Sequence, residues 1–130
     1  MPDEKSQILI VEDEISLASI YKEWLEEKGF AVTIAESGEQ GLIQIKKGGY
    51  NLILLDIMMP KMSGLEVLKS LKPEDKAKNG PIVMLSVLSQ EEIIKQALQN
   101  GATGFIMKSY TDLEELAQRV RSYLQKEGTV

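Results

Sequence analysis

The sequence predicts an α/β fold in which five β-strands alternate with five helices and form one doubly wound parallel sheet. Two observations lead to this prediction. Five short apolar segments recur along the chain, and several are rich in Ile, Val and Leu without polar alternation, as expected of strands covered on both faces. Segments with helical periodicity separate them, which gives a repeated β-α unit. The predicted strands are Ile8–Val11, Ala31–Ala35, Leu52–Leu55, Ile82–Leu85 and Gly104–Met107.

A helix is predicted after each strand. The first has apolar residues at helical spacing between Leu17 and Leu25 and ends at Gly29. The other four begin with a Ser or Thr followed three residues later by Glu or Gln, a capping-box pattern that satisfies free N–H groups at a helix start. These pairs are Ser37/Gln40, Ser63/Glu66, Ser89/Glu92 and Thr111/Glu114. The polar segment 72–81 is predicted to be a surface loop.

Composition indicates one domain and restricts its environment. The 130 residues fit a single domain, 1–130, in which we expect residues 1–6 to form a flexible tail. A balance of 20 acidic and 15 basic residues argues against direct contact with nucleic acid or with an anionic membrane. No apolar segment approaches the ~20 residues that span a bilayer, and the polar N-terminus is unlike a signal peptide. Together with the lack of cysteine, this favours a cytoplasmic protein.

The chemistry available to the chain is limited because the sequence has neither histidine nor cysteine. That absence excludes a Ser-His triad, a thiol nucleophile and a zinc site built from imidazole or thiolate ligands. A bound metal must therefore have oxygen ligands, which favours Mg²⁺, Mn²⁺ or Ca²⁺.

Unusual polar residues follow the predicted strands. Glu12 and Asp13 follow the first, Asp56 the third, Ser86 the fourth and Lys108 the fifth. In the flavodoxin-like strand order 2-1-3-4-5, the first and third strands are neighbours where the order reverses, so these side chains should converge there. Each has a simpler interpretation taken alone: the acids as helix caps, the serine as a loop hydroxyl, the lysine as a solvated charge. Their occurrence at one edge of one sheet favours a functional site.

Three carboxylates in one pocket repel one another and require a compensating cation. A divalent ion such as Mg²⁺ meets this need and keeps positions open for phosphate oxygens. Lys108 adds a positive charge that can pair with a carboxylate or a phosphoryl oxygen. Such a pocket can hold a phosphorylated donor in line with a carboxylate, and the product would be an aspartyl phosphate.

Four segments of the sequence resemble the receiver domain of two-component response regulators, of the single-domain, chemotaxis-regulator-like kind. They occur in the order of that family and together span essentially the whole chain. The segment from Asp56 to Gly64 reads D-x-x-M-P-x-M-x-G, which is similar to the phosphorylation-site stretch of these domains. The four segments are Ile8–Glu14, Asp56–Gly64, Pro81–Ser86 and Gly101–Lys108.

The resemblance implies a phosphorylatable signalling switch rather than a metabolic enzyme. It implies a sensor histidine kinase or histidine phosphotransfer protein as phosphodonor and Mg²⁺ as cofactor, with Mn²⁺ as an alternative. The signal would emerge on the face made by the fourth helix, the fifth strand and the last helix, which could dimerise on phosphorylation or dock a downstream target. The implied roles are phosphoacceptor for Asp56; metal binding for Glu12, Asp13, Asp56 and the Met58 backbone carbonyl; phosphoryl binding for Ser86 and Lys108; and switching for Ser86 and Phe105.

The sequence departs from the family pattern near the site. Ser109 follows Lys108 where proline with a cis peptide is usual, so we expect a differently shaped loop. Val87 is bulkier than the usual Ala or Gly and would narrow access for small phosphodonors. We hypothesise that the apolar side chains of Met58 and Leu88 hinder attacking water and make the phosphorylated state long-lived.

Two other functions compete with the phosphorylated switch. One is a receiver-fold binding module that acts without phosphorylation. The other is a hydrolase with Asp56 as nucleophile, which is disfavoured because Met58 stands where such enzymes have a second Asp. A flavin- or nucleotide-binding function is discarded, because the acidic run Glu12–Glu14 would repel a phosphate in the absence of metal. The chain is either a complete single-domain regulator or the receiver of a longer protein with a missing output domain.

Overall fold

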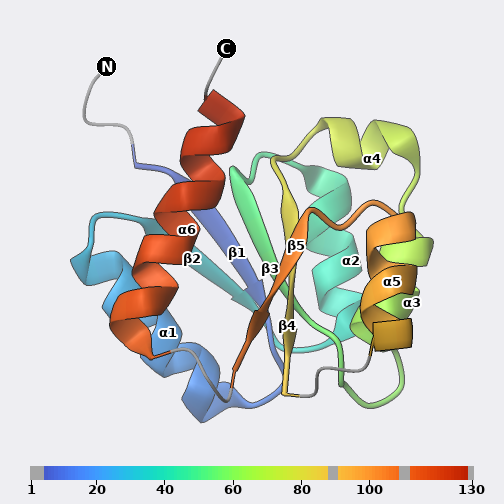
Figure 1. The fold of residues 1–130 in the computed structure, drawn as a ribbon, viewed down its shortest axis with the longest axis horizontal. Coiled ribbons are helices and arrows are strands. Elements are labelled where there is room, and N and C mark those ends of the chain that lie inside the picture. Colours follow the sequence, from blue (N-terminus) through green and yellow to red (C-terminus); the bar gives the residue numbers. More distant parts are fainter. Residues whose placement is uncertain (1–4, 88–90, 109–111, 129–130) are drawn as a thin grey trace.

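The computed structural model describes residues 5–87, 91–108 and 112–128. Its five strands form one parallel sheet in the order β2-β1-β3-β4-β5, as predicted (Figure 1). The apolar segments located the strands to within one residue, because residues of the central strands are buried on both faces and need no polar alternation. The strands are β1 (Gln7–Val11), β2 (Ala31–Ala35), β3 (Leu52–Asp56), β4 (Ile82–Ser86) and β5 (Gly104–Met107).

The helices form a layer on each face of the sheet (Figure 1). Helices α1 and α6 cover one face, where Leu25 and Val120 are fully buried against β1, β3 and β4. Helices α2, α3 and α5 cover the other, where Ile45, Val67 and Ala97 are buried. None of the helices in these described segments is long and apolar enough to cross a membrane. The helices are α1 (Ile15–Glu27), α2 (Gly38–Lys47), α3 (Gly64–Lys69), α4 (Pro73–Ala77), α5 (Glu91–Gln99) and α6 (Leu113–Gly128).

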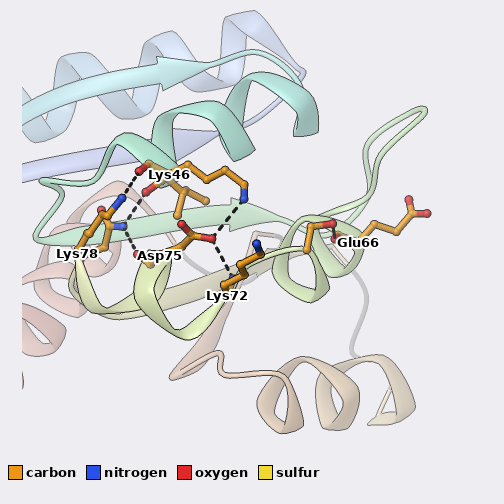
Figure 2. A network of polar contacts seen from close by, with 8 residues as sticks. Lys46, Glu66, Lys72, Asp75 and Lys78 are labelled. Carbon is orange, nitrogen blue, oxygen red and sulfur yellow. Dashed lines mark hydrogen bonds and ion pairs between the residues drawn. The ribbon is translucent and has the colours of Figure 1, made fainter.

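The prediction of a surface loop over residues 72–81 was wrong, because this segment contains the short helix α4. Pro73 occupies the first turn, where its missing N–H costs nothing. Asp75 is only 6% exposed, and its Oδ2 accepts hydrogen bonds from the Lys72 N–H at 2.9 Å and from Lys46 Nζ at 3.4 Å (Figure 2). The Lys72 N–H holds the pKa of Asp75 below its usual value. A segment that looks polar in sequence is therefore attached to the fold through a buried carboxylate.

The capping boxes were confirmed in part. At the start of α3, Ser63 Oγ accepts from the Glu66 N–H at 3.1 Å and Glu66 Oε1 accepts from the Ser63 N–H at 2.9 Å, which completes the box. At the start of α2, Ser37 Oγ accepts from the Gln40 N–H at 3.1 Å, but Gln40 Oε1 accepts from the N–H of Glu36 instead of closing the box. The predicted N-cap residue is therefore confirmed at both α2 and α3, whereas the reciprocal hydrogen bond of the capping box is present only at α3.

The start of α6 differs from the predicted Thr111/Glu114 pair. Asp112 provides the cap, since its Oδ1 accepts from the Glu115 N–H at 2.8 Å. A short acidic side chain immediately before the helix offers the same acceptor as Thr, so the pattern placed the cap one residue early. Thr111 itself lies outside the described residues, as does Ser89 of the box predicted before α5. The flexible tail predicted for residues 1–6 falls mostly outside them too.

Candidate functional site

Three carboxylates meet at the carboxyl end of the sheet. Glu12 and Asp13 directly follow β1, and Asp56 ends the neighbouring strand β3. One carboxylate oxygen from each lies within 4.8 Å of the other two. Glu12 and Asp56 are almost completely buried, at 1% and 3% exposed. The sequence prediction that these three side chains converge is confirmed by the strand order that brings β1 beside β3.

Lys108 reaches this cluster from the end of β5. Its Nζ lies 2.5 Å from Glu12 Oε1 and 3.1 Å from Asp56 Oδ2, and its side chain is only 10% exposed. The Lys108 N–H donates to the Ser86 carbonyl at 2.8 Å, which fixes the backbone at this point. Burial alone would lower the pKa of Lys108, but the hydrogen bond to Glu12 and the charge of Asp56 outweigh it and raise that pKa. The side chain is therefore a fixed cation inside the pocket.

Negative charge remains in excess in the pocket. Burial raises the pKa of Asp56 to about 7; the Lys108 charge opposes this rise and the Glu12 charge adds to it. Glu12 is already engaged through both oxygens, since its Oε2 accepts from the Glu14 N–H at 3.1 Å. Three carboxylates and one ammonium leave an excess of negative charge that a divalent cation would neutralise. A set of ligands made only of oxygen atoms suits Mg²⁺ or Mn²⁺. The residues present therefore fit the predicted metal.

Neither Glu12 nor Asp13 is the N-cap of α1 in the structure. The N-cap of α1 is Glu14, which makes no side-chain cap hydrogen bond. The Glu12 side chain accepts from the Glu14 N–H, yet its other oxygen points to Lys108. The acidic pair is therefore held toward the pocket rather than over the first turn of α1.

Gly64 positions Asp56, a role that the sequence analysis did not assign. The Gly64 N–H donates to the Ile57 carbonyl at 2.9 Å, which fixes the start of α3 against the end of β3. A Cβ at Gly64 would overlap the Asp56 carbonyl oxygen, so the close approach of the two backbones requires glycine. The only signal in the sequence was the glycine itself, four residues after Pro60.

Met58 and Val87 lie at the exposed side of the site. The Met58 N–H donates to Asp56 Oδ1 at 3.3 Å, while its side chain is 57% exposed. Val87, directly after β4, is 45% exposed. The metal-binding role of the Met58 carbonyl stays a prediction. Leu88 and Ser109, both invoked in the sequence analysis, lie outside the described residues.

The two predicted switch residues lie on β4 and β5. Ser86 is the last residue of β4 and is 4% exposed, one position beyond Leu85, which pairs with Asp56 in the sheet. Phe105 is half-buried on the edge strand β5, and its carbonyl accepts from Arg119 Nη2 at 2.8 Å. Its ring helps to line a surface groove of about 650 Å³ along α5. Ser86 thus lies at the carboxyl end of β4, beside the end of β3, and Phe105 lies on the predicted output face.

Tyr21 lies on the apolar face of α1 that the helical spacing between Leu17 and Leu25 predicted, and it is 8% exposed. Its pKa is raised by burial, and the charges of Lys108, Glu12 and Asp56 all act on it, the first lowering the pKa and the other two raising it. The phenol is therefore within electrostatic range of the pocket. Helical periodicity could not reveal this, because it identifies a buried face and not what lies at its end.

Comparison with known proteins agrees with this geometry. The sequence matches the family model of the response regulator receiver domain over residues 8–121. It is 40% identical over 126 residues to the uncharacterized transcriptional regulatory protein YkoG of Bacillus subtilis (strain 168), covering 97% of this chain and 54% of that protein. It is 36% identical over 121 residues to the transcriptional regulatory protein CpxR of Escherichia coli (strain K12), covering 93% of this chain and 50% of that protein. The chain thus spans about half the length of these relatives.

Solved structures show the same fold. A CheY-like response regulator receiver domain protein from Methanospirillum hungatei JF-1 superposes with a TM-score of 0.85 at 29% identity, covering 96% of this chain and 98% of that one. The receiver domain of the Francisella response regulator 1452 gives a TM-score of 0.81 at 29% identity, covering 94% of this chain and 98% of that one. With the family model matching most of the sequence and the fold matching throughout, this chain belongs to the receiver domain family of two-component response regulators.

Proposed function

We propose that Asp56 accepts a phosphoryl group from a phosphohistidine donor in a Mg²⁺-dependent reaction, and that the modified domain signals through its α5–β5–α6 face. One observation carries the proposal: Asp56 is held in a buried cluster with two further carboxylates within 4.8 Å and the Lys108 ammonium at 3.1 Å. This cluster combines a nucleophilic oxygen, a fixed ammonium and carboxylates that would hold a divalent cation, which are the groups that phosphoryl transfer requires.

In the proposed transfer, an oxygen of Asp56 attacks phosphorus. The O–P bond forms while the N–P bond of the donor breaks, and its electron pair returns to the imidazole nitrogen. Mg²⁺, held by Asp13, Asp56 and the Met58 carbonyl and by Glu12 through a water, would neutralise charge on the phosphoryl oxygens. Lys108 exchanges its contact with Asp56 Oδ2 for a phosphoryl oxygen and stays anchored to Glu12 at 2.5 Å. The Ser86 hydroxyl donates a further hydrogen bond.

The output of the proposed switch is the face of α5, β5 and α6. Ser86 moving toward the phosphoryl group would vacate space on β4, and Phe105 on the adjacent strand β5 would turn inward to fill it. The relatives are transcriptional regulatory proteins about twice as long as this chain, which supports a separate output domain or downstream target in a cytoplasmic pathway. A dimer that forms through this face on phosphorylation is a further part of the proposal.

Intact-mass spectrometry tests the phosphorylation directly. The protein is incubated with Mg²⁺ and phosphoramidate, and a single adduct of ~80 Da is expected. The adduct should be absent with EDTA and absent in Asp56→Asn. Because the exposed Val87 can obstruct small donors, the same measurement is made with a phosphorylated histidine phosphotransfer protein. Failure with both donors would contradict the proposal and favour a receiver-fold binding module that acts without phosphorylation.

A further inference from the structure

Met58 is the most accessible oxidisable sulfur in the described part of the chain. The sequence has no cysteine, so methionine provides all of its sulfur. Met84 and Met59 are buried, at 1% and 9% exposed, and Met62 and Met107 are half-buried. Met58 is 57% exposed. A peroxide in solution therefore reaches the Met58 thioether before the other methionines that the structure describes.

Met58 also lies directly beside the phosphoacceptor. Its N–H donates to Asp56 Oδ1 at 3.3 Å, so its backbone is part of the pocket wall. Its side chain lines an apolar groove of about 460 Å³, together with Leu65 of α3 and Ile93 of α5. The thioether thus lies in an exposed apolar groove on a residue whose backbone contacts Asp56, so a change in its polarity alters the surface beside the acidic pocket.

We propose that Met58 is an oxidation site whose sulfoxide shortens the lifetime of the phosphoryl group on Asp56. The inference deepens the proposed function and rests on it. The oxidant is hydrogen peroxide: a sulfur lone pair attacks one peroxide oxygen, an S–O bond forms and the O–O bond breaks. The departing hydroxide takes up the proton of the transferred oxygen and leaves as water. Sulfur is oxidised by two electrons, and peroxide is reduced by two.

The effect follows from the hydrogen-bonding capacity of the two forms of Met58. A thioether is a weak acceptor and leaves neighbouring water unoriented, whereas a sulfoxide oxygen is a strong acceptor. In the proposal, the sulfoxide holds a water on the solvent side of Asp56, from where that water can attack the bond that hydrolysis must break. One added hydrogen bond in the transition state corresponds to an acceleration of about 2- to 10-fold.

The experiment begins with the position of oxidation. The Mg²⁺-loaded protein is treated briefly with hydrogen peroxide, and peptide mass mapping locates each added oxygen of about 16 Da. We expect Met58 to be modified before Met62 and Met107. The protein is then phosphorylated and freed of donor, and the loss of the adduct is followed by intact mass. Each protein is its own reference, and the ratio of decay rates after and before peroxide is compared.

Two variants separate the site from general oxidation. Met58→Leu should lose the response to peroxide, and Met62→Leu, altered in the same loop, should retain it. Methionine sulfoxide reductases should restore the original decay rate. Equal oxidation of Met62 or Met107, an unchanged decay rate, or a response that survives in Met58→Leu would each overturn the inference. Absence of any phosphoryl adduct before peroxide treatment would instead contradict the proposed function, while the oxidation map would still decide whether Met58 is the reactive sulfur.

Discussion

Removing the charge of Asp56 should stabilise the metal-free protein, and more so at high pH. The pKa of Asp56 is about 7 in the folded state, whereas its ordinary value is 3.8. Between these two pH values the folded state therefore keeps a proton on Asp56 and the unfolded state does not. The stability of the wild type therefore falls as pH rises from about 4 to 7 and stays at its lower level above that. Asp56→Asn removes this dependence, because an amide does not titrate in this range.

The magnitude follows from the size of the shift. A rise of roughly 3 pKa units corresponds to ~4 kcal/mol of unfavourable free energy when Asp56 is ionised. The attraction to Lys108 is already included in this shift, so we expect Asp56→Asn to raise the free energy of unfolding by roughly 4 kcal/mol at pH 8 and by roughly 2 kcal/mol at pH 5.

Urea unfolding in EDTA, followed through the fluorescence of the single tryptophan Trp24, gives these values. Glu23→Gln, on the exposed side of α1, removes one negative charge away from the pocket and should show no comparable difference between pH 5 and pH 8. Saturating Mg²⁺ should stabilise the wild type but not Asp56→Asn, and so close the gap. A pH-independent difference between Asp56→Asn and the wild type would refute the reasoning, as would a variant less stable than the wild type at pH 8.

Three further perturbations follow from the structure. Gly64→Ala should lower the free energy of unfolding by about 1–3 kcal/mol and slow formation of the phosphoryl adduct, because its Cβ meets the Asp56 carbonyl; an unchanged urea midpoint would show that the backbone yields freely. Asp75→Asn should be less stable than the wild type above pH 3.8, and the difference in stability should shrink as pH falls through the lowered pKa of Asp75 in the folded state. A difference that stays constant during acid unfolding would contradict this prediction. Lys108→Gln should retain Mg²⁺ binding, measured by titration calorimetry, yet form the adduct at least ~10-fold more slowly. An unaltered rate would remove Lys108 from the transfer step.

The sheet and the convergence of the acidic residues could be predicted because both follow from burial. Strands buried on both faces have continuous apolar sequences, and the carboxyl ends of parallel strands lie at one edge, so Glu12, Asp13 and Asp56 had to meet once β1 was beside β3. Helix α4 could not be predicted in the same way. Its buried anchor is a charged residue, Asp75, and the partners that make its burial favourable come from Lys46 and the Lys72 backbone. Sequence patterns record polarity, not pairing.

The contacts inside the pocket also depended on pairing. The sequence placed Lys108 near the carboxylates, but it could not show that its ammonium lies closer to Glu12, at 2.5 Å, than to Asp56, at 3.1 Å. Nor could it show that Gly64 is needed for its lack of a Cβ, or that the Met58 side chain is turned to solvent while its N–H faces Asp56. Each of these depends on side-chain or backbone placement that several sequences with the same polarity pattern would satisfy differently.

Lys108 lies closer to Glu12 than to Asp56, and this difference determines which of the two carboxylates can change its contacts. Glu12 has both oxygens engaged, so it holds the ammonium in place whether or not Asp56 is modified. Asp56 keeps the weaker contact and carries the shifted pKa, so its state is the one that changes most readily. In the proposed function, phosphorylation adds about 1.5–2 negative charges to a pocket that already lacks compensation. Stabilising that charge requires new donors, and in the proposed function the hydroxyl of Ser86, one residue beyond the strand partner of Asp56, supplies one.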